Sequence, residues 1–205
     1  MEEIEKIVPD QRNGGKTDIE ETITLHSEQE AKDFFRIVRE RVQNVNRWHE
    51  FAGKLSADFH LTDDAGNEVN RFVQTGDYFR ISIPAPGTKT GEGYDWVRIE
   101  NIEDKPESGD SEAFGMTVRP ASNPKHQGSD VAHFFKDAAT SSFLVKRRGN
   151  QITGAVHGRN EIPNTETESK LDKARNALVG AGAIIGLSNP QWKSLVKGWL
   201  ERSEV

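Results

Sequence analysis

The sequence predicts an α+β fold in which a curved antiparallel sheet of six to seven strands packs on a long C-terminal helical segment. Three observations predict this fold. An amphipathic helix follows the first strand-like stretch, period-two segments joined by turn signals fill the middle of the chain, and helical periodicity returns near the C-terminus. Most of the predicted strands are linked by hairpins, so they are antiparallel. The 205 residues suit a single domain with a real core.

The N-terminal part predicts one strand and the clearest helix of the chain. Residues 1–18 read as a flexible polar leader, which leaves 19–205 as the domain. Alternating apolar residues predict a strand over 19–25. Ser27 followed by Glu30 is a capping box that starts a helix. One buried stripe at helical spacing follows, made of Ala31, Phe34, Phe35, Val38, Val42 and Val45.

The middle of the chain predicts the sheet. After Gly53 the apolar period changes to two, and Gly149–Asn150 is a two-residue hairpin signal. One connection, from Pro84 to Asp95, is far longer than a hairpin needs. We expect it to overhang the mouth of a cavity between sheet and helix. The alternative is a surface loop anchored by ordinary packing of Trp96.

The C-terminal part predicts two helices separated by a break at Gly186. Gly180 and Gly182 lie within the first, where each lowers helix stability by about 0.8–1 kcal/mol relative to Ala. Close approach of the helix to the sheet explains them, as does space left for a guest molecule; a membrane-surface role is a third reading. The last helix restarts at Pro190. Its apolar stripe, which includes Trp192, Leu195, Val196, Trp199 and Leu200, packs on the sheet or forms a dimer or membrane contact.

This order of elements resembles the START-like, or Bet v 1-like (SRPBCC), helix-grip family over residues 19–203. The resemblance rests on element order, on the turn "NVNRWHEFAG" after the first helix, and on the hairpin "GDYFRISIP…DWVRIENIE". The break at "GLSNP" departs from the family's simplest form. The resemblance implies a hydrophobic small molecule or lipid bound between sheet and helix. Cyclases and hydrolases occur in the family, but no catalytic pattern carries over to positions of this chain.

Composition excludes several classes of function. The net charge is −6 and the pI about 5.6, which argues against nonspecific nucleic-acid binding. The absence of cysteine excludes disulfides, thiolate chemistry and Cys-ligated metals. The six histidines show no metal-ligand spacing, so we expect no metal and no cofactor. No apolar run reaches membrane-spanning length and no signal peptide is visible, so the expected location is the cytoplasm.

We therefore expect noncatalytic binding of a hydrophobic or amphipathic small molecule in a cavity between sheet and helix. The candidate ligand-binding residues are Phe59, Ile81, Tyr94, Trp96, Phe114, Met116 and His133. In this hypothesis His133 is the polar anchor, because it shares a strand face with apolar neighbours. Two alternatives stay open. One is an enzyme of the same fold that uses His133 as acid or base, and the other is an interaction module that dimerises through the helix carrying Trp192 and Trp199.

Overall fold

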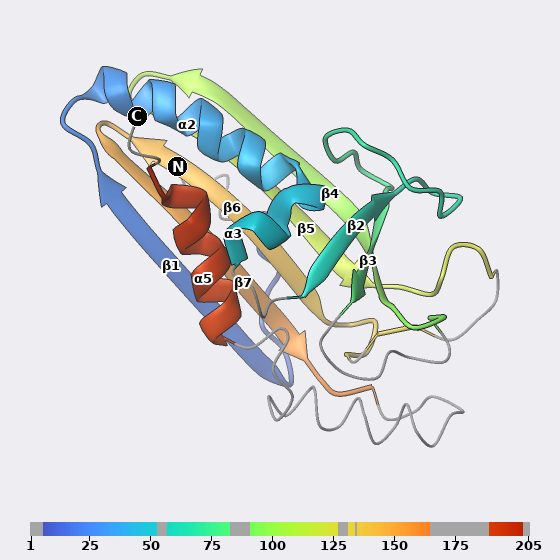
Figure 1. Ribbon diagram of the computed structural model, residues 1–205. Helices are drawn as coiled ribbons and strands as arrows, with labels where there is room; N and C mark the ends of the chain where they lie inside the picture. The colour runs from blue at the N-terminus through green and yellow to red at the C-terminus, as the bar shows by residue number, and fades with distance from the viewer. Residues whose placement is uncertain are drawn as a thin grey trace.

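A single antiparallel sheet organises the protein (Figure 1). The computed structural model describes residues 6–52, 57–82, 91–126, 131–133, 135–164 and 189–202. Over these residues the sheet has seven strands in the order β1-β7-β6-β5-β4-β3-β2, with every neighbouring pair antiparallel. The strands are β1 (Gly15–Thr24), β2 (Asp58–Thr62), β3 (Tyr78–Ser82), β4 (Asp95–Ser108), β5 (Ser111–Pro120), β6 (Thr140–Arg148) and β7 (Gln151–Glu161).

The described helices lie on one face of the sheet, which we call the inner face (Figure 1). They are α2 (Glu28–Gln43), η1 (Val45–Arg47), α3 (Trp48–Ala52) and α5 (Asn189–Leu200). The predicted fold class is therefore confirmed, and so is the restart of the last helix around Pro190. The predicted helix with Gly180 and Gly182, and the part of the long connection at 83–90, lie outside the described residues.

The start of α2 shows why the sequence folds locally as it does. The Ser27 hydroxyl accepts the backbone N–H of Glu30 at 3.1 Å, and the Glu30 carboxylate accepts the N–H of His26 at 3.0 Å. This reciprocal pair is the predicted capping box. The helix then buries one stripe against the sheet, namely Ala31, Phe35, Val38 and Val42.

The sheet begins before the predicted boundary at residue 18. β1 starts at Gly15, and the segment before it crosses the outer face of the sheet. Ile7 is 4% exposed and packs with Ala113, Leu144 and Ala155. The Thr117 hydroxyl donates to the carbonyl of Ile7 at 2.7 Å. The polar composition of residues 1–18 gave no indication of this contact, which depends on Ile7 and its neighbour Val8.

The centre of the inner face is filled by aromatic rings. Trp48 has no exposed surface and lies 4.6–5.9 Å, centroid to centroid, from the rings of Phe59, Phe79, Phe143 and Trp199. Its indole N–H donates to two carbonyls of α2, at 3.1 and 3.2 Å. Edge-to-face rings with a satisfied polar atom form a solid core here.

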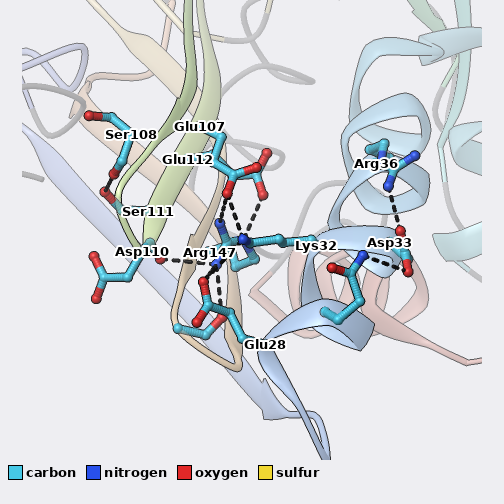
Figure 2. Close-up of polar contacts among 12 residues, drawn as sticks. Glu28, Lys32, Asp33, Arg36, Glu107, Ser108, Asp110, Ser111, Glu112 and Arg147 are labelled. Atoms are coloured by element: carbon cyan, nitrogen blue, oxygen red, sulfur yellow. Dashed lines mark hydrogen bonds and ion pairs between the residues drawn. The ribbon is translucent and has the colours of Figure 1, made fainter.

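The two ends of the sheet differ. At one, the hairpin end, the β4–β5 and β6–β7 turns meet the start of α2, and a charged cluster closes the core (Figure 2). Arg147 is fully buried there, with Nε 2.5 Å from a Glu112 carboxylate oxygen and with two turn carbonyls at 2.9 and 3.0 Å. Lys32 bridges Glu28 and Glu107 beside it, at 3.3 and 2.7 Å. A buried guanidinium needs such acceptors to offset its desolvation.

Candidate functional site: the loop end of the inner face

The other end of the sheet, which we call the loop end, is where β3, β5 and β7 finish and β2, β4 and β6 begin. Buried polar groups gather there. Asp95 pairs across the ladder with Ile81, and direct antiparallel partners project to the same face. Ile81 and its own partner Phe59 belong to the core, so Asp95 also faces inward. Its side chain has no exposed surface.

The segment around residue 132 joins this end through backbone bonds. The N–H of Trp96 donates to the carbonyl of Ala132 at 2.7 Å, which places the following residue, His133, beside the start of β4. The Asn164 side chain donates to the carbonyls of Val131 and His133, both at 3.2 Å. His133 and Asn164 are 5% and 7% exposed, so both are held in the interior.

The hydrogen bonding of His133 restricts its chemistry. Its Nδ1 accepts the backbone N–H of Phe135 at 3.0 Å. A neutral imidazole with Nδ1 as acceptor carries its proton on Nε2, so the ring presents a donor at Nε2. A role as a base through Nδ1 requires that the Phe135 bond be broken. The Nδ1 atom of His133 is therefore already engaged within the chain.

A second acidic group, Glu161, reaches the inner face from the end of β7. Thr17 pairs with Gly158 on the same face as the core residue Val156, and the Thr17 hydroxyl donates to both carboxylate oxygens of Glu161, at 3.0 and 3.2 Å. A Cβ on Gly158 would lie 2.1 Å from that carboxylate, so the Glu161 side chain fits here only because residue 158 has no side chain. Burial raises the pKa of Glu161 above its ordinary value, because the charged form is desolvated.

The structure separates the predicted ligand-binding residues into two groups. Four of them face inward and are 0–4% exposed: Phe59, Ile81, Phe114 and Met116. Phe59 and Ile81 are cross-strand neighbours at the loop end. Phe114 and Met116 lie further along β5, opposite Val145 and Phe143. All four belong to the main hydrophobic core of the described residues.

Tyr94 and Trp96 occupy the other face. Trp96 pairs with Arg80, which alternates with the inward-facing Ile81, so the Trp96 side chain projects outward. It is nevertheless 2% exposed, and its indole donates to the carbonyl of Gly91 at 3.1 Å. The Arg80 guanidinium lies 4.4 Å from the centre of the Tyr94 ring. In the described residues these aromatics therefore anchor the long connection by outer-face packing, as in the alternative reading.

The stripe of the last helix packs on the sheet. Trp199 has no exposed surface, and Trp192 lies 5.5 Å from Phe143 and 6.3 Å from Phe59. Most of this face is occupied within the chain, which favours the prediction that the stripe packs on the sheet over a dimer contact through Trp192 and Trp199. No described helix is long and apolar enough to cross a bilayer. No group of three or more acidic or histidine side chains in the described ranges is arranged to hold a metal.

Sequence reasoning found His133 but missed Asp95, Glu161 and Asn164. A signal for Asp95 was present, because 95, 97 and 99 share one parity on a strand and the last two are core residues. No such signal marks Glu161 or Asn164, which act through contacts between distant segments.

Comparison with known proteins gives distant fold likenesses. No family model matches the chain, and no curated protein matches its sequence. Solved structures that resemble it include Ara h 8.0201 (12% identity, TM-score 0.35, covering 91% of this chain and 99% of that one). A second is the ginseng major latex-like protein 151 from Panax ginseng (12% identity, TM-score 0.32, covering 82% of this chain and 95% of that one). A third is a point mutant of norcoclaurine synthase from Thalictrum flavum in complex with a transition-state analogue (10% identity, TM-score 0.36, covering 93% of this chain and 98% of that one). These are Bet v 1-like proteins. Similarity this distant assigns no function to the chain.

Proposed function

We propose that the protein is a noncatalytic binder of a small amphipathic molecule, held between the inner face of the sheet and the helices at the loop end. The observation that carries the proposal is the placement of three buried polar side chains, those of Asp95, His133 and Asn164, where an otherwise apolar inner face ends. Ligand sites typically combine apolar walls with a few convergent polar groups. Membership of the START-like, Bet v 1-like family is part of this proposal.

The packed centre limits the size of the ligand. Rings around Trp48 fill the middle of the inner face, and the buried Arg147 with its acidic partners closes the hairpin end. The ligand therefore enters from the loop end, with its apolar part against Phe59 and Ile81 and its polar head toward Asp95. A small molecule fits this arrangement better than a long-chain lipid.

Native mass spectrometry of the purified protein, followed by organic extraction, tests the proposal. A copurifying small apolar or amphipathic molecule supports it. Binding of the fluorescent probe 8-anilino-1-naphthalenesulfonate, and its displacement by the extracted compound or by medium-chain alcohols, then measures affinity.

Variants locate the site. Asp95→Asn and His133→Gln are expected to weaken the displacement of the probe by molecules with a polar head. The same variants should change displacement of the probe by the matched hydrocarbon much less. The control Ser108→Ala, an exposed position at the hairpin end, should leave both unchanged. If no molecule copurifies and the probe does not bind the folded protein, the proposal fails.

A further inference from the structure

The exposed large hydrophobic side chains of the described residues lie on one groove. Ile37 on α2 is 47% exposed, and Phe72, in the connection between β2 and β3, is 46% exposed. Both line a groove of about 930 Å³ between the C-terminal half of α2, α3 and the end of α5. Clustered rather than scattered apolar exposure is typical of an interaction surface.

The chain holds Phe72 outward on a rigid connection. Its neighbour Val73 is buried, and the N–H of Val73 donates to the carbonyl of Gln43 at 3.2 Å, at the end of α2. Arg71 makes a two-pronged bond to the buried carboxylate of Asp77, at 2.6 and 2.8 Å, and also donates to the carbonyl of Phe72 at 3.0 Å. These contacts hold the backbone on both sides of Phe72. They keep its ring in solvent rather than in the core.

The floor of the groove is equally fixed. Arg41 lies over the rings of Phe34 and Phe51, at 5.6 and 5.3 Å from their centres. It donates to the carbonyls of Trp199 and Glu201, at 2.8 and 2.7 Å, at the end of α5. A preformed floor beside a preformed aromatic projection lowers the ordering entropy lost when a partner binds.

Charge indicates which partner fits. The chain carries a net charge of −6, so copies repel each other over most approaches. The groove is an exception, because its lining has equal numbers of the two signs: Arg41, Arg47, Arg202, Glu40, Glu50 and Glu201. A two-fold contact brings the same patch of both copies together. A patch with both charge signs, and with both a projection and a recess, can match itself, whereas a patch of one sign would repel its copy.

We propose that two copies of this chain associate across this groove by a two-fold contact, with Phe72 of each copy seated beside Ile37 of the other. The surface is separate from the loop end and from the Trp192 and Trp199 stripe. The inference therefore stands or falls independently of the proposed ligand site. Central aromatic anchors of this kind dominate the affinity of protein interfaces.

Sedimentation velocity and light scattering over a micromolar to near-millimolar concentration series test the proposal. The wild-type chain should show a reversible monomer–dimer equilibrium. The variant Phe72→Ser with Ile37→Ser should raise the dissociation constant by at least about tenfold. The control Gln151→Ser, exposed on the outer face, should leave it unchanged. Both altered side chains are largely exposed, so we expect each protein to keep the wild-type circular dichroism.

Hydrogen exchange at low and high concentration locates the contact. Protection that grows with concentration in the C-terminal half of α2 and in residues 68–77 supports it. A wild-type chain that stays monomeric throughout overturns the proposal. So does a dimer that the double variant leaves intact, which would place the contact on another face.

Discussion

The packing of α5 on α3 allows one substitution to be predicted in detail. At Gly198, in the middle of the last turns of α5, an added methyl group would lie 2.3 Å from the carbonyl oxygen of Phe51. That oxygen belongs to the backbone, so the two helices must separate by about 1 Å to admit it. In an isolated helix the same change, Gly198→Ala, would stabilise by about 0.8–1 kcal/mol. Tertiary packing is therefore expected to reverse the sign.

The magnitude follows from these two opposing effects. Overpacking of a tight contact costs typically about 1–3 kcal/mol, and the upper part of that range applies because backbone must move. After the gain in helix propensity is subtracted, Gly198→Ala should lower the free energy of unfolding by about 1–2 kcal/mol. For a chain of this size the melting temperature should then fall by roughly 2–8 °C.

Urea and thermal unfolding, followed by circular dichroism and by tryptophan fluorescence, measure the effect. Trp48 and Trp199 are both buried, so their emission reports loss of the core. The control Lys197→Ala, an exposed neighbour on α5, should change stability by less than about 0.5 kcal/mol. An unchanged or increased stability of Gly198→Ala would refute the close contact between the two helices.

The remaining predictions concern the ends of the sheet and the N-terminal segment. Arg147→Ala leaves the carboxylate of Glu112 without its buried partner, so it should lower the free energy of unfolding in urea by about 3–5 kcal/mol. The double variant Arg147→Met with Glu112→Leu should recover part of that loss, because it removes both charges. Because burial raises the pKa of Glu161, the folded state holds that proton more tightly than the unfolded chain, and this group's contribution to stability falls as pH rises above its ordinary value of 4.5. The stability of Glu161→Gln relative to wild type should therefore increase between about pH 4 and about pH 7, and a difference independent of pH would contradict this. Ile7→Ala should cost about 2 kcal/mol or more, measured by the urea midpoint, whereas an unchanged midpoint would show that the segment does not anchor on the sheet.

The fold could be predicted from the periodicity of apolar residues, because this periodicity indicates which side of each helix or strand is buried. The capping box at Ser27, the helical stripe that follows it and the alternation of Phe79 and Ile81 are all local patterns, and the structure confirms the elements they predicted. The same rule of parity would have placed Trp96 outward and Asp95 inward. The prediction instead assigned Trp96 to the cavity by its aromatic character.

Other features depend on segments that meet only when the chain folds. Ile7 lies with Val8 in a mostly polar stretch, and its burial follows from contacts with Ala113, Leu144 and Ala155 on the outer faces of β5, β6 and β7. Glu161 becomes a half-buried acid because Thr17, on the neighbouring strand, donates to its carboxylate and Gly158 has no side chain to occupy the space. The exposure of Phe72 arises in the same way, since bonds to α2 and to Asp77 orient the connection that carries it.

By itself the sequence determined the order of helices and strands, the antiparallel sheet and the apolar side of each strand, because these follow from repeats of two and 3.6 residues along the chain. The tertiary structure decided how much of the interior is filled, which polar groups are buried together at the loop end, and which apolar side chains remain outside. Those outcomes depend on distances between residues far apart in the chain, and no local period encodes them.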